Sequence, residues 1–114
     1  MELQTEQMNE RITKITLSGR LDVAGTNAID SRFAAVTATQ GPNVIVDLSA
    51  VDFIGSMGVR LLLLNAKGLG ARGDKMILCK PGPMVRKVLE TIGIDAMIPI
   101  FNDIDSALRA LKQS

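Results

Sequence analysis

The stretch VIVDLSAVDFIGSMGVRLLLL, residues 44–64, decides the fold of this 114-residue chain. Val44–Val46 is an apolar run rich in β-branched residues, which is typical of a strand covered on both faces. The polar residues that begin at Asp47 indicate a turn, and Gly55-Ser56-Met57-Gly58 opens a helix. We predict Ser56 as the N-cap, because its hydroxyl can satisfy a free backbone N–H of the first turn.

The residues before this stretch predict two strands and a helix. Leu3–Met8 and Ile12–Ser18 alternate apolar and polar side chains and form an antiparallel hairpin in this interpretation. Thr26 is the predicted N-cap of a helix over residues 27–40, and Gly41-Pro42 is its predicted stop. One apolar stripe faces the core in that helix: Ile29, Phe33 and Val36.

The residues after the stretch predict two further strands, each followed by a helix. Lys75–Lys80 is a buried strand, and a helix over residues 84–92 follows with Gly93 at its end. Met97–Phe101 is a short strand at the sheet edge, because its Pro99 cannot donate to a ladder. Asn102 or Asp103 caps the last helix. The predicted core stripes of these two helices are Val85, Val88, Leu89 and Ile92, and Ile104, Ala107, Leu108 and Leu111.

The predicted order of elements is ββαβαβαβα. Alternating strands and helices favour right-handed crossovers and a mostly parallel sheet. We therefore expect one α/β domain over residues 1–114, a mixed sheet of about five strands flanked by about four helices.

The helix after Ser56 carries apolar side chains on two faces. Its predicted core face consists of Val59, Leu62, Leu63, Ala66 and Leu69. Met57, Leu61 and Leu64 lie on nearly the opposite face, beside Arg60. This second stripe is either a surface for a protein partner or is covered by the helix at 84–92. The pattern leaves both interpretations open.

Composition excludes several classes of function. Histidine is absent and Cys79 is the single cysteine, so catalytic triads, zinc sites and iron–sulfur clusters are not expected within one chain. A net charge of +1 and three aromatic residues give no reason to expect nucleic acid or an anionic membrane as a partner. We expect no enzyme activity, no cofactor and no metal. The first ten residues lack a signal-peptide pattern, so we expect a cytoplasmic protein.

One nucleotide-binding motif occurs in the wrong context. Gly68–Gly73 matches GxGxxG, but it follows a predicted helix and precedes a predicted strand, the reverse of the order that a dinucleotide site needs. We interpret it as a helix end and a turn. Cys79 lies in an apolar strand and is interpreted as a buried hydrophobic residue.

The segment DLSAVDFIGSMGVRLLL, residues 47–63, resembles the signature of the anti-sigma factor antagonist (STAS domain) family, DLS-x-V-x-F-[IM]-D-S-[ST]-G-[LV]. Gly19-Arg20-Leu21-Asp22 resembles the family's G-x-L-D, and the residues from Phe101 to Leu108 resemble its closing segment. The resemblance covers essentially the whole chain. The chain departs from the signature at two positions, where Gly55 replaces the aspartate and Met57 replaces the serine or threonine.

The resemblance implies a partner switch. The partner is an anti-sigma factor that is also a serine kinase of the histidine-kinase-like ATPase fold. That kinase phosphorylates the serine at the position of Ser56 and the antagonist is released, while a PP2C-type phosphatase restores binding. The expected partner-binding residues are Asp22, Gly55, Ser56, Met57, Gly58, Arg60, Leu61 and Leu64.

Two alternatives remain at this stage. The chain is a constitutive scaffold in which Ser56 is only an N-cap, or it is a nucleotide- or anion-binding regulatory domain that uses the same helix N-terminus as an anion site. Asp22 has two interpretations as well, as part of the partner surface or as a cap of the helix at 27–40.

Overall fold

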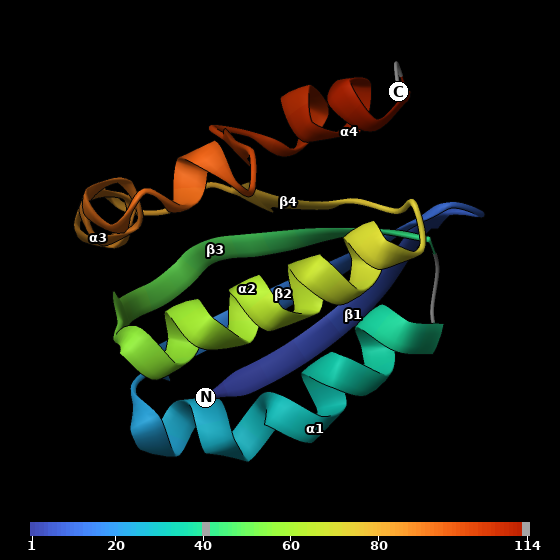
Figure 1. The fold of residues 1–114 in the computed structure, drawn as a ribbon. Helices are drawn as coiled ribbons and strands as arrows, with labels where there is room; N and C mark the ends of the chain where they lie inside the picture. Colours follow the sequence, from blue (N-terminus) through green and yellow to red (C-terminus); the bar gives the residue numbers. More distant parts are fainter. Residues whose placement is uncertain (40–41, 113–114) are drawn as a thin grey trace.

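The computed structural model describes residues 1–39 and 42–112 and contains one mixed sheet (Figure 1). The strands lie in the order β1-β2-β3-β4-β5, and every pair is parallel except β1 with β2. The strands are β1 Glu2–Asn9, β2 Ile12–Leu21, β3 Asn43–Ile54, β4 Met76–Cys79 and β5 Ile100–Phe101. The helices are α1 Val23–Thr39, α2 Ser56–Ala71, α3 Pro83–Ile92, a 3-10 turn at Ile94–Ala96, and α4 Ile104–Lys112. The predicted class and element order are confirmed.

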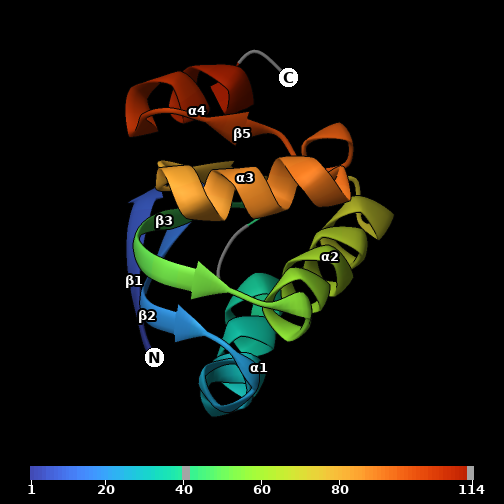
Figure 2. The same ribbon diagram turned by 90° about the vertical axis from the view of Figure 1, so that its left-hand side faces the viewer.

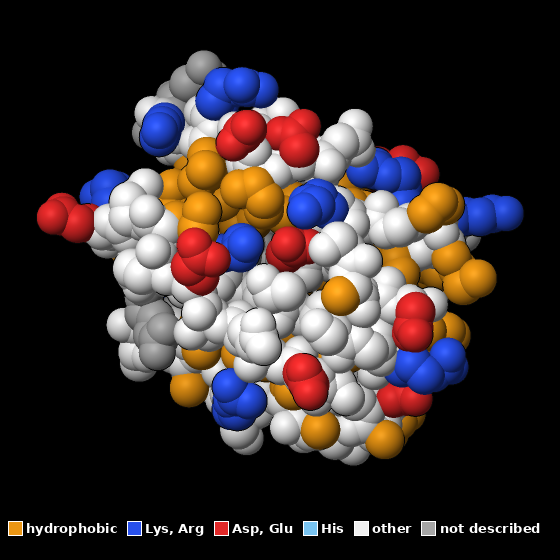
Figure 3. Space-filling view, turned by 180° about the vertical axis from the view of Figure 1, so that it is seen from behind, with side chains coloured by type: hydrophobic (Ala, Val, Ile, Leu, Met, Phe, Trp, Pro, Cys, Tyr) orange, Lys and Arg blue, Asp and Glu red, His pale blue; other side chains and the backbone are white. Residues whose placement is uncertain are grey.

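The sheet has a large core on one face and a small one on the other. Side chains alternate along β3, so Val44, Val46 and Leu48 enter the large cluster with α1, α2 and α3. Ile45 points the opposite way and packs under α4 in the small cluster. Figure 2 shows α4 on one side of the sheet and α1 and α2 on the other. Figure 3 shows hydrophobic side chains gathered beside α4, the helix that covers the small cluster.

β3 is much longer than the predicted strand Val44–Val46. It continues through Asp47 to Ile54, because β2 stays paired beside it across two register shifts. Asp47 is buried, and its Oδ1 accepts a hydrogen bond from the Ser49 N–H at 2.9 Å. This local bond satisfies the carboxylate within the strand, so the polar residues do not form the predicted turn.

The start of α1 also differs from the prediction. The helix begins at Val23, and Thr26 lies inside it as a buried residue rather than as its N-cap. Asp22 takes the capping role, because its Oδ1 accepts from the Gly25 N–H at 2.8 Å. An added Cβ on Gly25 would lie 1.9 Å from the Arg20 carbonyl oxygen, so this turn needs glycine. The predicted stop at Gly41-Pro42 lies partly outside the described residues.

The last third of the chain follows the prediction with local corrections. Gly93 ends α3 in the left-handed conformation with φ 87°, and the N–H of Ser106 donates to Asp103 at 2.7 Å, so Asp103 is the cap of α4. β5 is an edge strand, as Pro99 indicated, but it spans only Ile100–Phe101. Ile92 is exposed rather than part of the core. Residues 97–99, which were predicted to begin this strand, lie outside it and follow the 3-10 turn Ile94–Ala96.

Candidate functional site

The candidate site lies where β2 and β3 end and α1 and α2 begin. Parallel strands bring these ends to one edge of the sheet, which faces the viewer in Figure 2. The Gly55 N–H donates to the Leu21 carbonyl at 3.0 Å and joins the end of β2 to the start of α2. Asp22 and Ser56, 34 positions apart in the sequence, therefore lie at the same edge.

Ser56 is exposed at the first position of α2. Gly55 is the N-cap, and no side chain among residues 1–39 and 42–112 makes a capping hydrogen bond there. The prediction that Ser56 caps the helix is wrong, because a residue already inside the helix points its hydroxyl away from the first-turn N–H groups. The hydroxyl is consequently accessible at the positive end of a 16-residue helix.

Gly58 has a packing role one turn into α2. A Cβ at this position would lie 2.9 Å from the Leu21 Cβ and 3.1 Å from the Ile54 Cγ1. Glycine thus lets α2 approach the ends of β2 and β3 closely. Gly55 is different, since its φ of −107° suits any residue and an added Cβ would lie 3.4 Å from the Phe53 ring and 3.8 Å from the Leu21 carbonyl oxygen, without a close clash.

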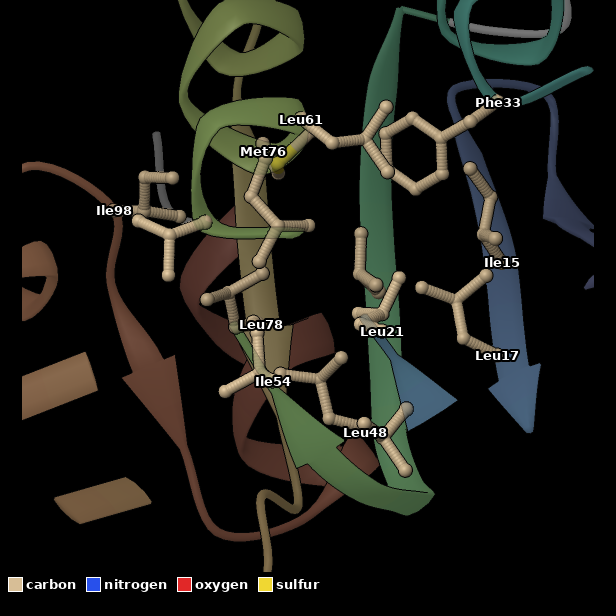
Figure 4. Packing of buried hydrophobic residues seen from close by; sticks show 14 of the residues in the cluster. Ile15, Leu17, Leu21, Phe33, Leu48, Ile54, Leu61, Met76, Leu78 and Ile98 are labelled. Atoms are coloured by element: carbon tan, nitrogen blue, oxygen red, sulfur yellow. The ribbon is translucent and has the colours of Figure 1, made fainter. Parts of the chain in front are cut away.

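The second apolar stripe of α2 divides into exposed and buried members. Met57 is 38% exposed and Leu64 is 54% exposed, so both remain on the surface. Leu61 is only 4% exposed, and the prediction that it lies on the outward face is wrong. Figure 4 shows Leu61 pointing toward the Phe33 ring of α1. The helix that covers it is α1, which packs beside α2, rather than the helix at 84–92.

Arg20 and Asp22 form a small charged group beside this surface. Arg20 Nε lies 3.6 Å from Asp22 Oδ2, and its guanidinium lies 4.4 Å from the centre of the Phe53 ring. The Gly25 N–H holds the pKa of the Asp22 carboxyl below its ordinary value, and Arg20 acts in the same direction. Asp22 is thus an ionised cap, and 40% of its side chain remains accessible to a partner.

Cys79 and the acidic residues do not form a reactive site in residues 1–39 and 42–112. Burial raises the pKa of the Cys79 thiol to about 12, and the nearby Asp47 acts in the same direction. Within those ranges, no group of three or more Cys, Asp or Glu residues is placed to hold a metal ion. The described helices include none with the length and apolarity to cross a bilayer.

Comparison with known proteins identifies the family. Residues 4–107 match the sequence profile of the STAS domain, and the chain belongs to that family. BtrV of Bordetella bronchiseptica, named as an anti-sigma factor antagonist, is 32% identical over 96 residues, which cover 84% of this chain and 83% of BtrV.

Solved structures agree on the fold. The crystal structure of an anti-sigma factor antagonist from Mycobacterium paratuberculosis has a TM-score of 0.89 and 28% identity, and the match covers 97% of this chain and 93% of that one. The anti-sigma factor antagonist SpoIIAA in its unphosphorylated form has a TM-score of 0.82 at 24% identity, with 99% and 98% covered. SpoIIAA of Bacillus in its phosphorylated form has a TM-score of 0.72, also at 24% identity, with 96% and 99% covered. The SpoIIAA likeness shows the fold.

Proposed function

We propose that this chain is a non-enzymatic anti-sigma factor antagonist controlled by phosphorylation of Ser56. In this proposal the unphosphorylated chain binds an anti-sigma factor with serine kinase activity in the cytoplasm, and so frees a sigma factor for transcription. The kinase phosphorylates Ser56 and is released, and a PP2C-type phosphatase reverses the modification. One observation supports this most. The Ser56 hydroxyl is exposed, makes no capping hydrogen bond in the described structure, and lies next to Met57 at the edge that carries Asp22.

The position of Ser56 supports an effect on binding rather than on folding. A phosphate carries a charge of about −1.5 to −2, and an anion at an exposed helix N-terminus is favoured by about 0.3–1 kcal/mol. The folded chain therefore accommodates the phosphate. A partner seated over Met57 and Leu64 would instead have to take the charged phosphate out of water, and this desolvation costs several kcal/mol. Each 1.4 kcal/mol weakens a complex about tenfold, so phosphorylation is sufficient for release.

The proposed contact surface is smaller than the set of residues expected from the sequence. Ser56, Met57, Arg60 and Leu64 are exposed and are proposed as contacts, together with the accessible part of Asp22. Gly55 is half-buried beside them. Gly58 and Leu61 are buried, and we propose that they support the surface from below without touching the partner.

Affinity capture with matched variants tests the proposal. Ser56→Ala and Ser56→Asp chains serve as baits in extracts of the native cells, and Ser31→Asp on the exposed side of α1 controls for the added charge. We expect Ser56→Ala and Ser31→Asp to capture a kinase-fold anti-sigma factor, and Ser56→Asp to bind the purified factor at least tenfold more weakly. All variants should keep wild-type thermal stability. Equal affinity of that factor for Ser56→Asp and Ser56→Ala would contradict the switch.

The same variants separate the proposal from its alternatives. A constitutive scaffold would bind its partner equally well with alanine or aspartate at position 56. A nucleotide- or anion-binding domain would gain thermal stability from a nucleotide with no protein partner present, because a ligand that binds only the folded state stabilises it. We expect flat melting temperatures across nucleoside mono-, di- and triphosphates.

A further inference from the structure

A small cleft lies between α1 and α2, next to the site. Its volume is about 80 Å³, room for the end of one side chain. Thr26 and Asp30 line it from α1, and Met57, Arg60 and Leu64 line it from α2. The two helices begin side by side in both ribbon views (Figures 1 and 2). The cleft shares Met57, Arg60 and Leu64 with the proposed contact surface.

The Thr26 hydroxyl is buried beside this cleft and has no hydrogen-bond partner in the described part of the chain. Thr26 is only 3% exposed, and its Oγ1 has no hydrogen-bond partner among the described residues. A buried polar group normally has such a partner, because leaving it unpaired is unfavourable. The hydroxyl is consequently available to donate to a group that enters from outside the chain.

Arg60 contributes a positive charge to the lining of the cleft. It is exposed and makes no ion pair or side-chain hydrogen bond with any residue in 1–39 or 42–112. Arg20, the other arginine of this edge, already contacts Asp22 and the Phe53 ring. The positive end of α2 adds to the charge of Arg60.

We infer that the cleft binds a carboxylate side chain of the partner through Arg60 and the Thr26 hydroxyl, and that a phosphate on Ser56 takes Arg60 away from that carboxylate. The inference rests on the proposed function and deepens it. The sign of the switch favours an anionic group over a cationic one. A phosphate at Ser56 would attract a partner's lysine or arginine and tighten the complex, whereas it repels a carboxylate.

The spacing of Ser56 and Arg60 favours the exchange. They are four residues apart in α2, so their side chains lie on the same face one turn apart. An acidic group four residues before a basic one is the favourable orientation for such a pair. The phosphate thus forms its ion pair within the chain, and the partner's carboxylate loses its counter-charge.

Phosphorus-31 NMR tests the ion pair between the Ser56 phosphate and Arg60 without any partner. Phosphoserine is encoded at position 56, and the second pKa of its phosphate is measured in four backgrounds: wild type, Arg60→Gln, Lys67→Gln and Arg20→Gln. Lys67 is the control because it lies on the same helix nearly three turns further on. We expect the pKa to be about 0.2–0.4 lower with Arg60 than with glutamine there, and unchanged by Lys67→Gln. Equal shifts in the two variants, or a larger one in Arg20→Gln, would overturn the inference.

Affinity for the captured anti-sigma factor tests the carboxylate. Asp30→Asn removes the negative charge on the cleft rim and should tighten binding two- to fivefold, whereas Asp95→Asn, a control on the exposed 3-10 turn, should change nothing. Thr26→Val should weaken binding while thermal stability stays equal or rises, because an unpaired buried hydroxyl has been removed. Weaker binding by Asp30→Asn would show a cationic occupant and overturn the inference.

The two proposals fail in different ways. If the phosphate has the same pKa in the wild type and in Arg60→Gln, the cleft mechanism is wrong, while the effect of Ser56→Asp on binding still stands. A captured factor that binds Ser56→Asp and Ser56→Ala equally overturns the proposed function, whatever the phosphate titration shows.

Discussion

Replacing Gly25 by alanine should strongly destabilise the chain, because α1 begins in direct contact with the end of β2. The added methyl would lie 1.9 Å from the Arg20 carbonyl oxygen and 3.1 Å from Asp22 Oδ1. The backbone oxygen cannot rotate away, so the first turn of α1 must shift. That shift also breaks the 2.8 Å bond from the Gly25 N–H to Asp22.

The magnitude follows from these two losses. Overpacking costs about 1–3 kcal/mol and a lost cap about 0.5–2 kcal/mol, while alanine in a helix regains up to about 1 kcal/mol. These ranges combine to a net loss of about 0.5–5 kcal/mol, and we take the middle of this span, about 2–4 kcal/mol, as the expected value. An unfolding entropy of about 2.1 cal/mol/K per residue over 114 residues converts this to a Tm lower by about 8–17 °C.

Differential scanning calorimetry measures the effect, with Gly68→Ala as the matched control. Gly68 also lies in a helix, but an added Cβ there would meet no other part of the described structure within 4 Å, apart from its chain neighbours and the backbone of its own helix. Alanine at that exposed position should raise the Tm by about 2–4 °C, from about 0.4–1 kcal/mol. If Gly25→Ala melts within 2 °C of the wild type, the close approach of α1 to Arg20 is refuted.

Three further predictions follow from burial and charge. Leu61→Ala should lower the free energy of unfolding in urea by about 2–5 kcal/mol, because it leaves a cavity under α1. The control Leu64→Ala should change this free energy by less than about 0.5 kcal/mol. Equal effects of the two substitutions would contradict the burial of Leu61. Because the pKa of Asp22 is lower in the folded chain than in the unfolded chain, its carboxylate stabilises the fold at any pH above the unfolded pKa, and this stabilisation is lost as the pH falls through the folded pKa. Asp22→Asn should therefore flatten the curve of unfolding free energy against pH in acid. An unchanged curve would exclude this cap as a source of acid sensitivity. Cys79 should resist a thiol reagent at pH 8 in the folded chain and react at once in denaturant; fast labelling of folded chain would show that the thiol is accessible.

The sequence predicts the fold well where local pattern and long-range packing agree. The apolar run at Val44–Val46 and the helix ends at Gly93 and Asp103 are set by neighbours within a few positions, and the structure confirms them. Parallel pairing depends instead on strands distant in the sequence. β3 extends to Ile54 because it pairs with β2. The sequence does not indicate this extension, because the polar residue Asp47 in mid-strand has the pattern of a turn.

The structure brings the predicted site residues Asp22 and Ser56 to one edge of the sheet, and two capping roles predicted from the sequence are wrong. Thr26 and Ser56 have the residue types of N-caps, but Asp22 and Gly55 occupy the capping positions. For the cap of α1 the sequence did hold a signal, because Asp22 stands three residues before Gly25, the spacing of a capping hydrogen bond. No signal marked Leu61 as buried, because its environment depends on how α1 crosses α2. Only the structure separates the exposed Met57 and Leu64 from it.

The phosphorylation state of Ser56 in free and partner-bound chains tests the central claim most directly. Native cell extract is separated by size, and the peptide that contains Ser56 is quantified by mass spectrometry in the complex and free fractions. We predict unmodified Ser56 in the complex and phosphorylated Ser56 in the free chain. The same phosphate content in both fractions, or well-covered peptide with no phosphate in either, would contradict the switch.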